Sequence, residues 1–221
     1  MNKGAKITLL FLSTFISLII ILTAYYGVDR YIIMHLSSTE NYVKNYSNMS
    51  NHSEKVIVSF STTQENFKKL KPTINSLLDQ TVKVHAFNMN LPPKKENYNI
   101  PSKYKEICNV NYIGKDYGPG NNIIPTLLTT KDKGTKIIYL KEDVVYGKDF
   151  LEKMITESNK YPSNAIVYKK NNKVCASLIK PEFFSVDVID NNQKYFDENW
   201  ITSHLLNPAK ELKYIENYKK L

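Results

Sequence analysis

Two adjacent acids, Glu142 and Asp143, follow a short apolar stretch and have side chains that could bind a metal ion. The stretch begins at Lys136 with Lys-Ile-Ile-Tyr-Leu and lies between Gly134 and Gly147. A β-branched, apolar run of this length is typical of a buried parallel strand and is too short for a helix. In open α/β sheets, ligands bind at the carboxyl ends of the strands. Carboxylates placed there can hold a divalent cation, and the cation can hold a diphosphate.

The same acidic pair also has a purely structural interpretation. Asp and Glu often close a strand and cap the helix that follows it. Short motifs of this kind produce many false positives, so the surrounding elements have to decide between a metal site and a simple turn.

Composition limits the class of protein. The chain has 221 residues, of which 42% are hydrophobic and 12% aromatic, enough for one domain with a core and a short appendage. The net charge of +9 comes from lysines spread along the chain, without an Arg-rich block or a nucleic-acid motif, so we expect no nucleic-acid partner. Cys108 and Cys175 fit no zinc or redox spacing. Two buried free thiols, or one disulfide in an oxidising compartment, both remain open.

The amino-terminal region predicts a membrane anchor. Residues 1–6 are short and basic, and residues 7–28 contain no charged side chain. At about 1.5 Å per residue the second segment can cross a hydrocarbon core of about 30 Å. We expect an uncleaved anchor and not a signal peptide, because Thr23-Ala24-Tyr25-Tyr26 is a poor cleavage site. Lys3 and Lys6 favour a cytoplasmic amino terminus, so the protein would be a single-pass, type II membrane protein with a lumenal or extracytoplasmic domain.

Residues 29–54 are polar and rich in Ser and Asn, and we expect them to form a stem between the anchor and a domain over 55–221. The segment contains three consecutive N-glycosylation sequons, at Asn45, Asn48 and Asn51. They would be modified only in a secretory lumen. Chance is the alternative explanation, because Asn and Ser are common in this chain.

From residue 55 onward, strand-like and helix-like patterns alternate. We expect strands at 55–60, 82–91, 109–113, 136–141, 165–168 and 174–179, and helices at 67–78, 101–107, 123–128, 149–158 and from Asp197. This alternation predicts an α/β fold with a largely parallel sheet. No Gly-rich phosphate loop follows the first strand, which argues against an ordinary dinucleotide-binding or P-loop enzyme.

The order of five segments resembles membrane-associated, family-2-like glycosyltransferases of the nucleotide-diphospho-sugar (type A) fold. The resemblance covers roughly residues 55–206 and implies a single Rossmann-like domain. It also implies transfer of a sugar from a nucleotide-sugar donor to a hydroxyl group of a glycan or protein acceptor, with inversion. The five segments are Val58-Ser59-Phe60-Ser61-Thr62, the helix from Leu70 to Thr81, Lys115-Asp116-Tyr117-Gly118-Pro119, Glu142-Asp143-Val144-Val145-Tyr146 and Asp197-Glu198-Asn199-Trp200-Ile201.

This resemblance implies a donor-binding role for several polar residues. Ser59, Ser61 and Thr62 would line the nucleotide pocket through their hydroxyl groups and backbone. Asp116 would hold the nucleoside or order its own loop.

The resemblance also implies where the chemistry would occur. Asp143, together with Glu142, would bind a divalent cation, Mn²⁺ or Mg²⁺, that neutralises the diphosphate leaving group. Asp197 or Glu198 would be the general base that accepts the proton of the acceptor hydroxyl. Capping of a helix is the alternative role for this second acidic pair.

Three positions depart from the family pattern. Lys141 stands where the family usually has the first acid of its Asp-x-Asp motif. Asn66 replaces an Arg that many members have after the first strand, and Asn122 replaces a basic residue after the Gly-Pro turn. Lys141 could bind the diphosphate directly as a point charge, or it could mark an inactive site. The alternative function is therefore a catalytically inactive, membrane-anchored module that binds a glycan or a protein.

Overall fold

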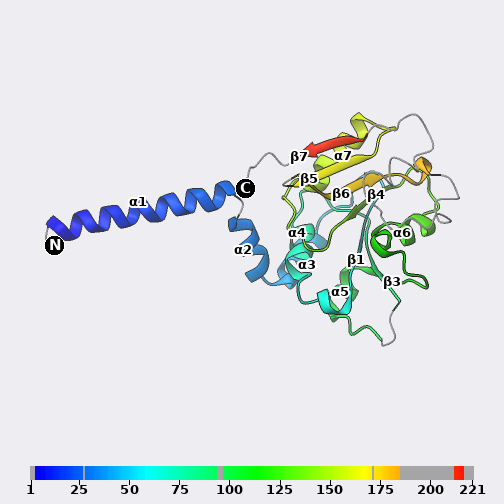
Figure 1. The fold of residues 1–221 in the computed structure, drawn as a ribbon, viewed down its shortest axis with the longest axis horizontal. Coiled ribbons are helices and arrows are strands. Elements are labelled where there is room, and N and C mark those ends of the chain that lie inside the picture. The colour runs from blue at the N-terminus through cyan, green and yellow to red at the C-terminus, as the bar shows by residue number, and fades with distance from the viewer. Residues whose placement is uncertain (1–2, 27, 94–96, 171, 185–211, 217–221) are drawn as a thin grey trace.

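The computed structural model describes residues 3–26, 28–93, 97–170, 172–184 and 212–216. A long helix, α1 (Lys3–Tyr26), projects from an α/β body (Figure 1). Its segment Gly4–Thr23 is long and apolar enough to cross a membrane, and none of it is buried against the rest of the protein. A helix of this length and composition near an amino terminus can be a membrane anchor or a signal sequence.

The body is built on one seven-stranded sheet with the order β3-β2-β1-β4-β6-β5-β7. The first four strands in the chain run parallel to one another, β6 runs antiparallel to both β4 and β5, and β7 runs parallel to β5. The α/β prediction with a mostly parallel sheet is confirmed. The strands are β1 (Val56–Ser61), β2 (Ala86–Leu91), β3 (Asn109–Tyr112), β4 (Lys136–Leu140), β5 (Ile166–Lys170), β6 (Lys173–Ile179) and β7 (Lys213–Glu216).

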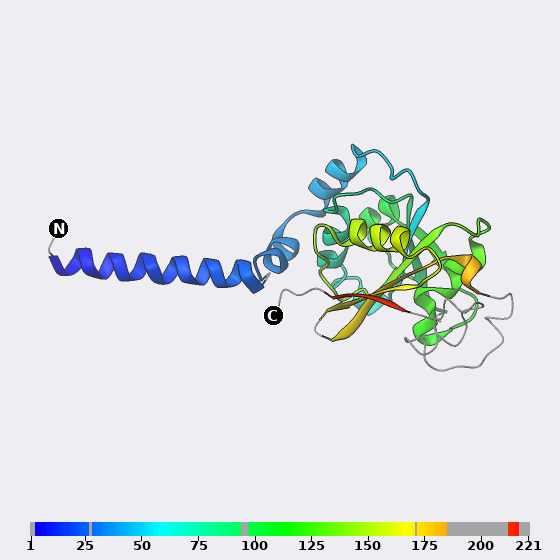
Figure 2. The same cartoon turned by 90° about the horizontal axis from the view of Figure 1, so that it is seen from above.

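Helices cover both faces of the sheet (Figure 2). Because side chains alternate along a strand, Ile138 and Leu140 of β4 pack on one side and Ile137 on the other. The larger layer contains α4 (Lys71–Leu78), α5 (Ser102–Ile107) and α7 (Phe150–Lys160), and the smaller layer contains α6 (Ile124–Thr129). The described part of the body also contains three short 3-10 helices: η1 (Gln64–Asn66), η2 (Gly118–Asn122) and η3 (Pro181–Phe183).

The segment expected to be a polar stem is folded onto the body. It forms α2 (Val28–Leu36) and α3 (Thr39–Ser47), and its side chains Met34 and Tyr46 are buried. The Tyr46 hydroxyl accepts a hydrogen bond from the backbone N–H of Val84 at 2.8 Å. Hydrogen bonds supplement the few apolar side chains that dock these helices. Because a segment with few apolar residues has the composition of a linker, the sequence alone suggested a stem.

Other predicted elements are confirmed with shifted ends. The helix expected from residue 67 begins at Lys71. Pro72 suits its first turn, because the N–H groups there have no acceptor within the helix and proline has no N–H. The strand expected from residue 82 begins at Ala86. The helix expected from Asp197 lies outside the described residues, and β7 was not predicted.

Candidate functional site

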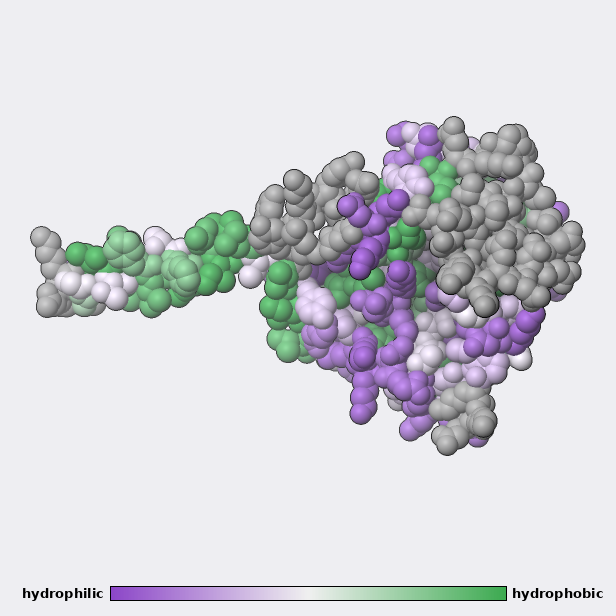
Figure 3. All heavy atoms as spheres, in the orientation of Figure 1, coloured by the Kyte–Doolittle hydropathy of each residue, from purple (hydrophilic) through white to green (hydrophobic). Residues whose placement is uncertain are grey.

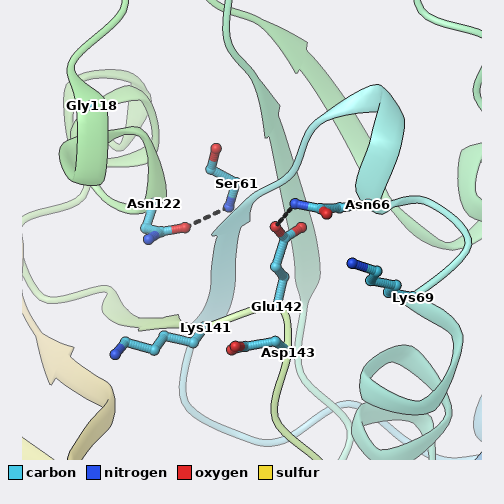
Figure 4. A pocket seen from close by; sticks show the side chains of 8 residues that line it. All are labelled: Ser61, Asn66, Lys69, Gly118, Asn122, Lys141, Glu142 and Asp143. Atoms are coloured by element: carbon cyan, nitrogen blue, oxygen red, sulfur yellow. Dashed lines mark hydrogen bonds between the residues drawn. The ribbon is translucent and has the colours of Figure 1, made fainter.

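A cavity of about 420 Å³ opens where β1 and β4 end. The two strands are parallel neighbours with Ser59 opposite Tyr139, so the residues that follow each strand emerge side by side. This is the edge at which α/β proteins bind ligands. Among the described residues, eight line the cavity: Ser61, Asn66, Lys69, Gly118, Asn122, Lys141, Glu142 and Asp143 (Figure 4).

The loop that carries the two acids is held by α4 and β6. Thr73 Oγ1 donates to the carbonyl of Glu142 at 2.6 Å, and Ser76 Oγ accepts from the Tyr146 N–H at 3.1 Å. The buried Tyr146 hydroxyl lies 3.0 Å from the carbonyl oxygens of both Lys141 and Cys175. Backbone groups of the loop are thus bonded on both sides, which leaves the side chains of the acidic pair to face the cavity.

The surroundings of Glu142 in the cavity disfavour its charged form. Its Oε1 accepts a hydrogen bond from Asn66 Nδ2 at 2.7 Å, whereas its buried Oε2 has no hydrogen-bond partner among the described residues. Burial raises the pKa of this carboxyl, and the negative charge of Asp143 raises it further. Asn66 and the Thr62 hydroxyl beside it act in the opposite direction, although Thr62 does not reach normal hydrogen-bond geometry. A buried carboxylate oxygen in this state would be stabilised by a proton or by a cation.

These two carboxylates fit a divalent cation only with help from a ligand. No group of three or more His, Cys, Asp or Glu side chains that could hold a metal occurs among the described residues. Mg²⁺ commonly uses one or two carboxylates together with waters and phosphate oxygens. The unpartnered Oε2 of Glu142 and the exposed carboxylate of Asp143 match that incomplete donor set.

Two lysines bring positive charge to the same cavity. Lys69 lies on one side of the acidic pair and Lys141 extends on the other (Figure 4). Lys141 was singled out from the sequence, but Lys69 was not, because nothing in the run Lys68-Lys69-Leu70-Lys71 distinguishes it from the neighbouring lysines. Two exposed ammonium groups beside a possible cation site suit an anionic ligand.

The opposite wall comes from η2 and the turn before it. Asn122 Oδ1 accepts a hydrogen bond from the Ser61 N–H at 2.7 Å. Asp116 Oδ1 accepts from the Gly118 N–H at 2.8 Å and from Asn121 Nδ2 at 2.7 Å. Gly118 has a φ of 58°, a conformation that favours glycine. Asp116 thus orders its own loop, which is one of the two roles expected for it.

The structure separates the residues expected to line a nucleotide pocket. Ser61 faces the cavity, whereas Ser59 and Thr62 are buried behind its wall. Ser59 Oγ donates to the carbonyl of Asn122 at 2.6 Å and lies 2.7 Å from Thr126 Oγ1, so it braces η2 and α6.

Asp197 and Glu198 lie outside the described residues. Among the cavity residues, Asn66 and Asn122 had been noted only as departures from a family pattern. Both cysteines are buried and unpaired, as in the first of the two alternatives.

Comparisons with known proteins bear on the fold. No protein-family model matches the chain, and no curated protein matches it in sequence. Among solved structures, a protein described as a putative nucleotide-diphospho-sugar transferase, from Desulfovibrio desulfuricans G20, is 12% identical, with 74% of this chain and 80% of that chain covered and a TM-score of 0.50. S. aureus TarS is 13% identical over 74% of this chain and 35% of that chain, with a TM-score of 0.49. The fold around the cavity is therefore like that of a nucleotide-diphospho-sugar transferase, the type A glycosyltransferase fold.

Proposed function

We propose that this protein is a glycosyltransferase that moves a sugar from a nucleotide-sugar donor to a hydroxyl group of a glycan or protein acceptor. The observation that supports the proposal is the cavity at the ends of β1 and β4, where two carboxylates and two lysines meet in a glycosyltransferase-like fold. Both positive and negative side chains are needed at such a site, because the donor is an anion that a cation accompanies.

Different cavity residues bind different parts of the donor. Lys69 and Lys141 attract the diphosphate, and Ser61 and Asn122 shape the wall that faces the nucleotide. Glu142 and Asp143 hold a divalent cation, Mn²⁺ or Mg²⁺. When bound, the cation supplies charge neutralisation at the diphosphate as it leaves.

The transfer step requires a base on the acceptor side. We assign it to Asp197 or Glu198 on the basis of the family resemblance. The carboxylate accepts the proton of the acceptor hydroxyl while that oxygen bonds to the anomeric carbon. The bond to the diphosphate breaks on the opposite face, so the anomeric configuration is inverted.

We further propose that α1 is an uncleaved anchor with the domain on the lumenal or extracytoplasmic side. Support comes from Lys3 and Lys6, which precede the uncharged run of residues 7–28. The three sequon residues Asn45, Asn48 and Asn51 are all exposed, so the fold leaves them accessible to glycosylation. Expression in a cell with a secretory pathway tests this topology. A gel mobility unchanged by glycosidase, together with cytoplasmic protease access to the domain, would contradict it.

Donor binding tests the enzymatic proposal. The full-length chain in detergent is screened for thermal stabilisation by a panel of nucleotide sugars with Mn²⁺ or Mg²⁺, and donor hydrolysis is then measured with each that binds. A ligand present at about 100 times its Kd should raise the stability of the native state by about 2.7 kcal/mol. If no nucleotide sugar stabilises the protein or is hydrolysed, the proposal is wrong.

Two substitutions show whether a metal ion or the Lys141 ammonium neutralises the diphosphate. Asp143→Asn should remove the stabilisation by Mn²⁺ and most hydrolysis, whereas Glu106→Gln, at an exposed acid on α5, should change neither. Lys141→Asp should strengthen metal dependence if a metal neutralises the diphosphate. It should abolish activity if Lys141 itself supplies that charge, because an acid would then face an anion.

The second candidate is a catalytically inactive glycan- or protein-binding module. Lys141 favours it, since this residue brings a positive charge into the cavity where the family pattern has a metal-binding acid. This candidate predicts glycan or protein binding without donor hydrolysis at any metal concentration.

A further inference from the structure

The short helix α2 has an apolar outer face that nothing in the described chain covers. Its five outward large side chains are between 38% and 79% exposed, with Leu36 the most exposed. Val28, Ile32 and Leu36 are spaced four residues apart and so form one line along the helix. Tyr31 and Ile33 flank that line. Asp29 and His35 are the exposed polar residues of the same helix.

The opposite side of α2 is fixed to the body. Met34 is buried, and its carbonyl accepts a hydrogen bond from Asn75 Nδ2 at 2.9 Å. Arg30, the single arginine of the chain, forms a 2.7 Å ion pair with Asp79 just after α4. Lys71 Nζ donates to the carbonyl of His35 at 2.8 Å. The helix cannot turn its apolar line inward without breaking these bonds, so the exposure is built into the fold.

The position of α2 indicates what covers this face. It begins two residues after α1 ends, and α1 is itself apolar and uncovered. Figures 1 and 2 show α2 running across the direction of α1 at the end nearest the body. In Figure 3 an apolar patch also lies on the edge of the body nearest α1. A spanning α1 of 24 residues would be about 36 Å long, so α2 would lie at the level of the lipid headgroups and along the membrane plane.

We propose that the outer face of α2 lies in the interfacial layer of a lipid bilayer and holds the body against the membrane. Interfacial helices bury an apolar face to a depth of about 5–10 Å, and Tyr is a preferred residue at that level. Lys71 and Lys148, which lies 4.0 Å from Asp79, are adjacent to α2 and suit anionic headgroups.

This contact would also orient the cavity. Arg30 Nε donates to the carbonyl of Tyr146 at 2.8 Å, and Tyr146 closes the loop that carries Glu142 and Asp143. A single side chain therefore connects the membrane-facing helix to the acidic loop. The proposal does not depend on which donor the cavity binds.

Lipid-attached quenchers test the proposal in the full-length chain. Leu36→Cys and Ile33→Cys are labelled with an NBD fluorophore and reconstituted into phosphatidylcholine–phosphatidylglycerol vesicles that contain nitroxide lipids. Cys108 and Cys175 are buried, so the unsubstituted chain serves as the labelling blank. Leu128→Cys is the matched control, because Leu128 is 51% exposed on α6, on the other face of the sheet.

The α2 probes should lose most of their fluorescence, more with a nitroxide near the headgroup than with one deep in the acyl chains, while the Leu128 probe stays bright. Equal brightness of the α2 and Leu128 probes would overturn the proposal. So would efficient disulfide cross-linking between Leu36→Cys chains without lipid quenching, since a second copy would then cover the face. The readout uses no nucleotide sugar, so its failure and a failure of the proposed activity are distinguishable.

Discussion

Replacing Glu142 by Gln should stabilise the protein and weaken its binding of metal and donor. The carboxylate keeps one oxygen bonded to Asn66, while its buried Oε2 and the buried hydroxyl of Thr62 both lack a hydrogen-bond partner within the described residues. An amide at this position still accepts from Asn66 through its oxygen. Its neutral NH2 group replaces the charged, unpartnered oxygen, so the substitution removes a partly buried charge next to Asp143.

The size of the effect follows from the loss of that charged, unpartnered oxygen. An unsatisfied buried polar group costs about 1–3 kcal/mol. Glu142 is only partly buried, so we expect the lower end of that range, about 1 kcal/mol at neutral pH. For a chain of this size such a gain raises the melting temperature by about 2–4 °C.

The gain should depend on pH with a definite sign. Burial raises the pKa of Glu142, so the folded state binds its proton more tightly than the unfolded state. The wild-type chain therefore loses stability as pH rises from the usual glutamate range through the raised pKa. Gln does not titrate, so the advantage of the variant should be small near about pH 4 and full near about pH 8. Melting curves of both chains in detergent with EDTA, at a series of pH values, measure this difference.

A matched control separates this effect from a general loss of negative charge. Glu106→Gln, on the exposed side of α5, should change stability by no more than about 0.5 kcal/mol at any pH. If Glu142→Gln melts no higher than wild type at neutral pH, or gains equal stability at acidic pH, then burial of the charged Glu142 carboxylate does not destabilise the folded state. If it gains stability and still binds Mn²⁺ and donor as wild type does, the metal assignment is wrong.

Three further outcomes test how α2 and α3 are joined to the body. Arg30→Met removes a charged hydrogen bond to Asp79, so unfolding in urea should require about 2 kcal/mol less; an unchanged midpoint would refute this role. Tyr46→Phe leaves the buried N–H of Val84 without its 2.8 Å partner and should cost about 1–2 kcal/mol by the same assay, whereas no loss would mean that water replaces the hydroxyl. A chain that begins at Lys55 should be digested faster by protease than one that begins at residue 28, and equal rates would show that 28–54 is a dispensable stem.

Much of the architecture could be predicted from the sequence because it depends on local patterns. The β-branched run at Lys136–Leu140 forms a central strand since its apolar side chains suit burial on both faces. The alternation of strand-like and helix-like segments predicted the α/β class for the same reason. These two facts also predicted that Glu142 and Asp143 follow the end of a strand. They placed that strand end at the edge of the sheet where α/β proteins bind ligands.

Only the tertiary structure decided which distant segments provide the partners of each site residue. Asn66 and Glu142 are 76 residues apart in the chain and lie 2.7 Å apart in the fold. Lys69 faces the cavity because α4 begins next to the acidic loop, which no local spacing shows. Ser59 and Ser61 look alike in sequence and lie on the same face of β1, yet α6 covers the first, whereas the second is the last residue of the strand and lies at the cavity. Residues 28–47 looked like a polar linker, because composition does not reveal the hydrogen bonds with remote backbone and side-chain groups that hold them to the body.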